Sequence, residues 1–380
     1  MFADDGPHRI YVTVSSLTGR LDQSLTVAED IKKVTAGSSR PWKTIESPFM
    51  RVFITGGTGM IGRRLVRHLK DRGDTPVILS RKAEETRRDP DFRDLTVVQG
   101  DPAREGPWQE AVDGCDAVCN LAGQNVFGKR WNAEIKRQIR DSRVYGAERI
   151  VEAIARAKQP PRILVEGSAI GYYGNHDDEE LTESSPSGSD FLAVVCRELE
   201  EAARQVEPLG VRLATIRTGV VLGKGEGALG IMEPIFKLGG ASPIGNGGHP
   251  FRPATGRQWM SWIHIDDILG IFLLALDHPE ARGPINGTSP NPTRNVDFSR
   301  TLARLLHRPF LPIGPPDLAL SLMLGEVAQV VTKGQKVLPT RALQLGYRFL
   351  YPDLAEALQA ALEPDRVSTE PASSQAEHPG

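Results

Sequence analysis

Glycines at a fixed spacing are the strongest chemical signal in the sequence. Gly56, Gly59 and Gly62 occur in the segment TGGTGMIG, between an apolar run at 52–55 and a helix expected from about Ile61 to Asp71. In such a loop the first glycine makes a tight turn, the second lets the backbone approach a pyrophosphate, and the third lets the helix pack on the strand. The helix N-terminus adds free N–H groups and partial positive charge. These features predict a dinucleotide loop, with a ligand-free turn as the alternative, made of Gly56, Thr58, Gly59, Met60, Ile61 and Gly62.

Ser80, Arg81 and Lys82 follow the loop at the position where NAD enzymes place a carboxylate on the adenosine ribose, about 20 residues further on. A hydroxyl, a guanidinium and an ammonium suit a 2′-phosphate, because Arg and Lys make charge-assisted hydrogen bonds to phosphate oxygens. We therefore predict NADP(H) as the cofactor. The alternative is a solvated basic turn. Asp101, after the next strand-like run, could approach the adenine amino group or form an ordinary turn.

Short β-branched runs alternate with longer amphipathic stretches from Arg51 onward, as in βαβ units of a parallel sheet covered on both faces. In the long helix expected at Asn132–Ala157, isoleucines recur near helical spacing. The pattern predicts an α/β fold, a Rossmann doubly wound parallel sheet with a smaller C-terminal substrate lobe. The expected strands are Val52–Thr55, Val77–Ser80, Leu95–Gln99, Ala117–Leu121, Ile163–Glu166 and Arg212–Arg217.

The pattern changes after Gly219, which divides the chain. A Gly- and Pro-rich stretch, Gly223–Gly256, is too long for a simple connection and is expected to be a lid or binding loop. Further helices are expected at Asp266–Asp277, Val296–His307 and Asp353–Leu362. The predicted division is a poorly ordered extension (1–49), an NADP-binding core (50–222), a substrate lobe (223–363) with elements that can cross between lobes, and a disordered tail (364–380).

Composition excludes several classes of function. The 380 residues carry 46 Lys and Arg against 48 Asp and Glu, a net charge of -2, which argues against nucleic acid or an anionic membrane as partner. The longest apolar run, Ile268–Leu276, is far shorter than the roughly 20 residues of a membrane span. The three cysteines form no disulfide framework and have no zinc-binding spacing. We expect a cytoplasmic protein that acts on a small molecule and has no metal site.

Several motifs in one order resemble extended short-chain dehydrogenase/reductases, and within them the branch described as "epimerase family protein" or NAD-dependent epimerase/dehydratase, some members of which carry a cell-division-inhibitor label. The similarity covers about residues 50–363. The motifs are the glycine loop, NLAGQN (Asn120–Asn125), DSR (Asp141–Arg143), RTGVVLG (Arg217–Gly223), SWIHIDD (Ser261–Asp267), NGTSPNP (Asn286–Pro292) and a C-terminal segment, Gly325–Leu362.

The resemblance implies further cofactor contacts at matching positions. Leu121, Ala122 and Gly123 would lie along the nicotinamide, with Gln138 and Arg143 on the long helix and Val221 in RTGVVLG. Each could instead be strand-end core or a polar helix face. Arg143 also has a physical argument, because a cation beside a dinucleotide can pair with phosphate. Homodimers occur among relatives, so a homodimer is a further possibility.

The family's catalytic pattern fails in this chain. Short-chain dehydrogenases typically use Ser or Thr with a Tyr-x-x-x-Lys pair. In this pair the lysine lowers the tyrosine pKa, so that the phenol can exchange a proton during hydride transfer. Ser168 fits the first position, but the alignment places Leu192 at the tyrosine and Cys196 at the lysine. Leucine has no proton to exchange, and a neutral cysteine has no charge with which to lower a neighbouring pKa. A reactive thiol at Cys196 is an alternative to a structural one.

Other side chains could replace the missing pair. Tyr172 and Tyr173 follow Ser168 on the loop leaving the fifth strand, toward the sheet edge where ligands bind. His264 could donate a proton, with Asp266 or Asp267 orienting it, or could cap or pack the next helix. Asp266 is expected to be that helix's N-cap. The catalytic candidates are Ser168, Tyr172 and His264.

Two functions are consistent with this pattern. The first is an NADP(H)-dependent oxidoreductase or epimerase acting on an unidentified carbonyl or sugar-type metabolite without the usual Tyr-x-x-x-Lys pair. The second, suggested by that missing pair, is a non-catalytic NADP(H)-responsive binding or regulatory protein.

Overall fold

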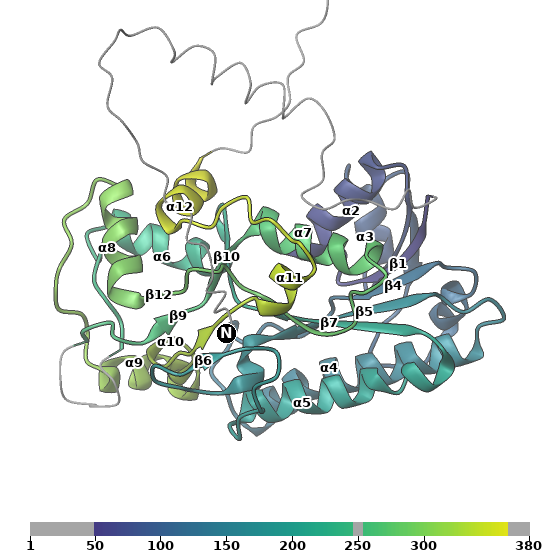
Figure 1. Cartoon of the computed structure of the whole chain (residues 1–380), viewed down its shortest axis with the longest axis horizontal. Coiled ribbons are helices and arrows are strands. Elements are labelled where there is room, and N and C mark those ends of the chain that lie inside the picture. Colours follow the sequence, from purple (N-terminus) through teal and green to yellow (C-terminus); the bar gives the residue numbers. More distant parts are fainter. Residues whose placement is uncertain (1–48, 246–253, 364–380) are drawn as a thin grey trace, which may run out of the picture. The chain divides into compact units, whose positions relative to one another are not determined.

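A computed structural model of the whole chain describes residues 49–245 and 254–363 (Figure 1). The predicted N-terminal extension, except Phe49, and the predicted tail lie outside the described residues, as does part of the predicted loop at 223–256. No described helix is both long enough and apolar enough to cross a membrane.

Seven parallel strands form the central sheet, in the order β3-β2-β1-β4-β5-β7-β11. The predicted α/β fold with a doubly wound parallel sheet is therefore confirmed. The strand order reverses between β1 and β4, and ligands of such sheets bind at the carboxyl ends of the strands beside this switch point. The strands are β1 Arg51–Thr55, β2 Thr75–Ser80, β3 Thr96–Gln99, β4 Ala117–Asn120, β5 Ile163–Ala169, β7 Arg212–Thr218 and β11 Gly283–Gly287.

Helices cover both faces of this sheet (Figure 1). Helices α2 (Met60–Asp71) and α7 (Ile265–Asp277) pack on one face, and α4 (Ala133–Arg156) and α5 (Phe191–Arg204) on the other. Asn132 caps α4 by accepting a hydrogen bond from the Ile135 N–H at 2.9 Å, and Asp190 caps α5 in the same way. Capping by Asn or Asp side chains satisfies N–H groups that helix starts leave unpaired.

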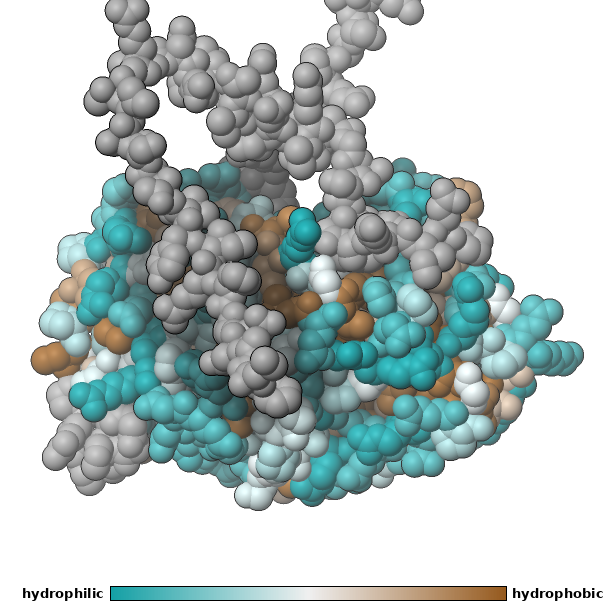
Figure 2. Space-filling model, in the orientation of Figure 1, coloured by the Kyte–Doolittle hydropathy of each residue, from teal (hydrophilic) through white to brown (hydrophobic). Residues whose placement is uncertain are grey.

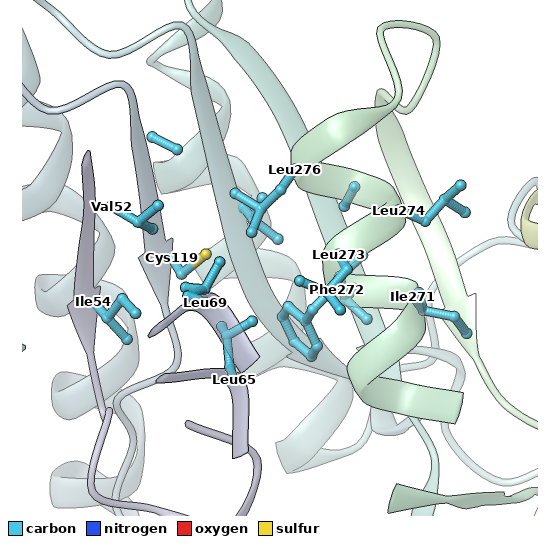
Figure 3. Close-up of a cluster of buried hydrophobic side chains, with 14 of the residues drawn as sticks. Val52, Ile54, Leu65, Leu69, Cys119, Ile271, Phe272, Leu273, Leu274 and Leu276 are labelled. Carbon is cyan, nitrogen blue, oxygen red and sulfur yellow. The ribbon is translucent and has the colours of Figure 1, made fainter. Parts of the chain in front are cut away.

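Alternating side chains of the strands supply the two core layers. Val52 and Ile54 of β1 point toward α2 and α7, whereas Phe53 between them packs in the layer under α4 and α5. Figure 3 shows side chains of β1, β4, α2 and α7 meeting in the first layer. On the outside, hydrophilic side chains cover most of the visible surface over α4 and α5 (Figure 2).

A smaller core contains Leu222, Leu229, Trp262, Phe298 and Leu358. The described residues also form three two-stranded sheets, and one of them joins the two predicted lobes, because β6 pairs with β13 beside a separate small cluster that contains Leu181 and Val337. The strands are β6 Glu180–Leu181, β8 Val220–Gly223, β9 Trp259–Met260, β10 Trp262–His264, β12 Thr293–Arg294 and β13 Lys336–Val337. The α-helices are α6 Gly227–Lys237, α8 Asn295–Leu305, α9 Asp317–Leu324, α10 Ala328–Thr332, α11 Thr340–Gln344 and α12 Leu354–Leu362, in addition to α3 Ala83–Arg88 beside the central sheet. The 3₁₀ helices are η1 Pro107–Val112, η2 Ile170–Tyr173, η3 Glu207–Leu209 and η4 Gly325–Val327.

Asp267 attaches the C-terminal segment to the first turn of α7. Its buried carboxylate accepts hydrogen bonds from the N–H groups of Leu350 at 2.7 Å and Tyr351 at 2.9 Å, and from the Tyr347 hydroxyl at 3.1 Å. Burial raises the pKa of Asp267, and these donors oppose that rise. The predicted orienting role of Asp267 toward His264 is thus replaced by a structural one.

Candidate functional site

The glycine loop lies at the switch point between β1 and β4. Gly56 has φ +66°, and a Cβ there would lie 2.7 Å from the Leu121 carbonyl carbon. The Gly59 N–H donates to the Gly56 oxygen at 3.0 Å, and a Cβ on Gly62 would lie 2.2 Å from that oxygen. Helix α2 begins at Met60, and the first turn carries no acidic residue. The loop therefore leaves a helix N-terminus open to an anion.

A pocket of about 420 Å³ opens from this loop along the carboxyl ends of β1, β2 and β4. Ten of the predicted cofactor residues line it: Gly56, Thr58, Gly59, Ser80, Arg81, Lys82, Asp101, Leu121, Ala122 and Gly123. The sequence interpretation missed the other lining residues: Arg63, Leu79, Glu85, Thr86, Asp89, Pro102, Gln124 and Ser142. The shape suits a dinucleotide that crosses the switch point.

Short local contacts hold the end of the pocket where Ser80, Arg81 and Lys82 lie. The Ser80 hydroxyl lies 2.8 Å from that of Thr86 and accepts the Lys82 N–H at 3.1 Å. Lys82 forms an exposed ion pair with Glu85 at 2.8 Å, while the Arg81 carbonyl accepts from Gln99 at 2.7 Å. Ser80 is thus fixed at the end of β2, and Arg81 lies exposed on the pocket wall.

Asp101 forms the ordinary turn that was one of its two alternatives, and its approach to an adenine amino group stays a prediction. It lines the pocket, and its carboxylate accepts the Ala103 N–H at 3.1 Å, which is the ordinary Asx turn.

A buried hydrogen-bond chain supports the opposite end of the pocket. The Thr55 hydroxyl donates to the Asn120 side chain at 2.5 Å and accepts the N–H groups of Leu121 and Ala122, each at 3.2 Å. The Asn120 amide then donates to both oxygens of Glu166, at 2.9 and 3.0 Å. Burial raises the pKa of Glu166 well above its ordinary value. These bonds fix the backbone that would face a nicotinamide.

Arg143 lies against the same segment without lining the pocket itself. Its guanidinium carbon would be 3.0 Å from a Cβ on Gly123, and it donates to the carbonyls of Gln124 and Ile139 at 3.0 and 3.1 Å. Burial lowers the pKa of Arg143. Its visible role is to hold residues 123–124 in place.

Five other predicted cofactor residues lie around the pocket rather than on its wall. Met60 and Val221 both lie beside Gly227. Ile61 packs against the hydrophobic core, and Gly62 lies against the backbone of the glycine loop. Gln138 lies on the exposed side of α4, where it donates to Glu134 at 2.8 Å. Contact of Met60, Ile61, Gly62, Val221 or Gln138 with a cofactor stays a prediction.

Ser168 lies at the carboxyl end of β5 beside a buried ion pair. Its hydroxyl donates to Glu200 Oε1 at 2.9 Å. Arg217 of β7 binds both oxygens of Glu200, through Nε at 2.9 Å and Nη2 at 2.7 Å. The side chains of Glu200 and Arg217 are only 4% and 3% exposed. The Ser168 proton is therefore directed into the protein, and its lone pairs remain to accept a hydrogen bond from a ligand.

The two tyrosines after Ser168 both contact Arg217. The Tyr173 hydroxyl accepts from Arg217 at 3.0 Å and donates to Asn286 at 2.7 Å, and the Tyr172 ring lies 3.4 Å from the guanidinium carbon. Burial raises the pKa of Tyr173 to about 12. Tyr173 is therefore a structural residue, while Tyr172 is half-buried over the cation and stays a catalytic candidate.

Leu192 and Cys196 lie on the first turns of α5, facing Gly171. A Cβ on Gly171 would be 3.5 Å from Leu192 Cβ and 4.0 Å from Cys196 Sγ. Burial raises the pKa of the Cys196 thiol to about 11, and Glu200 adds to this rise. Cys196 is therefore a neutral thiol that cannot replace a catalytic lysine.

We expect slow alkylation of all three cysteines in the native protein at about pH 8, because the thiolate is the reactive form. Burial raises the pKa of Cys115 to about 11 and that of Cys119 to about 12, as it does for Cys196. Mass spectrometry after iodoacetamide treatment should find little native modification and complete modification in urea. Rapid native alkylation of Cys196 would instead support a reactive thiol.

His264 is placed as a helix cap. Its Nδ1 accepts the Asp266 N–H at 3.2 Å, and its ring, 4% exposed, lies 4.0 Å from the Tyr351 ring. The predicted N-cap at Asp266 is thus wrong: His264 is the N-cap of α7, and Asp266 lies in the first turn. Burial lowers the pKa of His264, which favours the neutral ring. The contact with the Asp266 N–H is that of the capping alternative, while Asp266 Oδ2 lies 3.5 Å from Nδ1, so Asp266 also stands beside the ring as the orienting alternative expects; a catalytic role stays a prediction.

The chain belongs to the NAD dependent epimerase/dehydratase family, whose model matches residues 52–286. A second model, described as a domain of unknown function (DUF1731), matches residues 315–361 and so covers all but the last residue of the predicted family-specific C-terminal segment, Gly325–Leu362.

The chain is similar to several proteins named as epimerase family proteins, including SDR39U1 and its homologues. The "Epimerase family protein SDR39U1 homolog, chloroplastic" of Arabidopsis thaliana is 42% identical over 83% of this chain and 87% of its own length. The Bacillus subtilis "Epimerase family protein YfhF" is 37% identical over 81% of this chain and 97% of its own length. A crystal structure of human SDR39U1 (isoform2) with NADPH has a TM-score of 0.72 at 34% identity, covering 82% of this chain and 99% of that one.

Proposed function

We propose that the chain binds NADP(H) in the pocket at the switch point and is an oxidoreductase or epimerase acting on a carbonyl or alcohol group of a small metabolite. The pocket itself carries this proposal, because Ser80 and the basic residues Arg81 and Lys82 lie at one end. Its other end is lined by residues 121–124, which follow β4, and β4 pairs with β5, the strand that bears Ser168. The NADPH named for the human relative supports the choice of cofactor.

The residues of the pocket fit such a cofactor. Gly59 leaves the start of α2 open for the pyrophosphate, and Arg81 and Lys82 supply cations for a 2′-phosphate. When bound, the nicotinamide would supply or accept a hydride. Leu121 and Ala122, held by Thr55, would position the ring.

Ser168 would orient the substrate. Because its proton goes to Glu200, Ser168 accepts a hydrogen bond and so favours a substrate hydroxyl over a carbonyl oxygen at that point. Tyr172 is the remaining proton-exchanging side chain after Ser168, and Arg217 lies against its ring.

Replacing Arg81 with alanine tests the cofactor assignment. We expect NADPH affinity to fall about tenfold or more, because a charge-assisted contact to the 2′-phosphate is lost, whereas NADH affinity should stay within about threefold. Titration by cofactor fluorescence measures both. Arg88→Ala, an exposed arginine of α3 outside the pocket wall, is the matched control. Equal losses for both cofactors would reject the 2′-phosphate site.

A second candidate function rests on Leu192 and Cys196 at the positions of the missing tyrosine and lysine. In a non-catalytic NADP(H)-responsive protein, NADPH would raise the melting temperature and change binding to another protein, without turnover. Incubating the protein with NADPH or NADP+ and a broad panel of carbonyl compounds, alcohols and sugar nucleotides separates the two functions. NADPH oxidation, NADP+ reduction or conversion of a sugar nucleotide to its epimer supports the enzyme, and a melting shift without any of these supports the regulatory protein.

A further inference from the structure

Arg63 is a pocket residue that the cofactor assignment leaves unused. It lies on the first turn of α2, one residue after Gly62, and lines the same pocket as Ser80 and Arg81. Its guanidinium binds two carboxylates, Asp89 at 2.8 Å and Asp91 at 2.5 Å. The Phe92 ring, fully buried, lies 4.9 Å from the guanidinium carbon. Arg63 is therefore a well-anchored cation at the end of the pocket where Ser80 and Arg81 lie.

The two carboxylates that bind Arg63 have different surroundings. Asp91 is also bound by Arg67, through Nε at 2.9 Å and Nη2 at 2.7 Å, and does not line the pocket. Asp89 lines the pocket, and its other oxygen accepts the Asp91 N–H at 3.0 Å. The pairing with Asp91 can thus persist while that with Asp89 changes.

Besides Arg81, the cations at this end of the pocket become available to an anion only if an internal ion pair opens. Lys82 is already paired with Glu85, and Arg63 with Asp89. The hydrogen bond from Arg63 lowers the pKa of Asp89, so that carboxylate is an anion at neutral pH. A 2′-phosphate carries up to two negative charges and binds best to more than one cation.

We propose that Arg63 is a second ligand of the cofactor 2′-phosphate and that Asp89 competes with this phosphate for the guanidinium. The proposal rests on the proposed NADP(H) function and deepens it. On binding, the phosphate takes the side of Arg63 that Asp89 holds, while Asp91 and Phe92 keep the guanidinium in place. NADH has no group to displace Asp89, so the Arg63–Asp89 pair sets how strongly the pocket prefers NADP(H).

Three variants of the full chain test this role, with NADPH and NADH as the probes. Arg63→Ala should weaken NADPH binding about tenfold or more and change NADH binding by less than about threefold. Arg67→Ala is the matched control, since Arg67 is the next arginine on this face of α2, pairs with Asp91 and stays outside the pocket wall. Asp89→Asn keeps Arg63 and the side-chain size, and should strengthen NADPH binding while NADH binding does not rise.

The outcomes separate this inference from the function on which it rests. If the unmodified protein binds neither nucleotide, the proposed function fails, and this proposal fails with it. Two results would overturn only the role of Arg63 in a protein that does bind NADPH. In the first, Arg63→Ala weakens NADPH binding no more than Arg67→Ala does. In the second, Arg63→Ala weakens the binding of NADPH and NADH equally. Weaker NADPH binding by Asp89→Asn would show that Asp89 does not compete with the 2′-phosphate for Arg63. Melting curves without cofactor identify any variant that fails to fold.

Discussion

Replacing Glu200 with alanine is expected to destabilise the protein by about 3–5 kcal/mol, because it leaves the Arg217 cation buried without its counter-charge. Both side chains of the pair are almost fully buried, and both oxygens of Glu200 are bound by Arg217. Ser168 loses its acceptor in the same variant. Urea unfolding followed by circular dichroism measures the change in free energy.

The neighbouring Glu201 gives a matched control on the same helix. Its side chain is 58% exposed and lies 3.9 Å from Arg197, so Glu201→Ala should change stability by no more than about 0.5 kcal/mol. Replacing both partners, Glu200→Leu with Arg217→Met, should recover part of the loss, since no unpaired charge remains. A Glu200→Ala variant as stable as Glu201→Ala would show that the ion pair does not support the fold.

The sheet was predictable where strands are apolar and β-branched. All six strands expected from the sequence form, within a few residues of their predicted ends. The seventh strand, β11, was missed because GPING has glycine at both ends and a proline, which weaken the strand signal. Helix α6 was missed inside the predicted loop at 223–256 because glycine and proline dominate that stretch.

The site was predictable where its residues are close in sequence. The glycine loop and Ser80–Lys82 are contiguous segments, and each lines the pocket. Arg63 pairs with a residue 28 positions away, and Ser168 with one 32 positions away, so spacing could not reveal either contact. A signal for the buried pair did exist. Arg217 is a charged residue near the end of an apolar strand run, where burial demands a partner.

Replacing Gly62 with alanine is expected to abolish tight NADPH binding and to destabilise the protein by about 3 kcal/mol or more. The new Cβ would lie 2.2 Å from the Gly56 oxygen and 2.8 Å from Gly57 Cα, and both are backbone atoms that cannot rotate away. The loop or the start of α2 must therefore move, and the surface that would receive the pyrophosphate moves with it. Cofactor titration and urea unfolding measure the two effects.

Gly146 provides the same substitution in a helix without the obstruction. A Cβ there meets no described heavy atom within 4 Å, so Gly146→Ala in α4 should stabilise the protein by about 0.5–1 kcal/mol through helix propensity. NADPH binding should not change in this variant. The contrast isolates the close approach at Gly62 from the general effect of alanine in a helix. If Gly62→Ala bound NADPH as well as Gly146→Ala, the tight loop geometry would not be what forms the binding site.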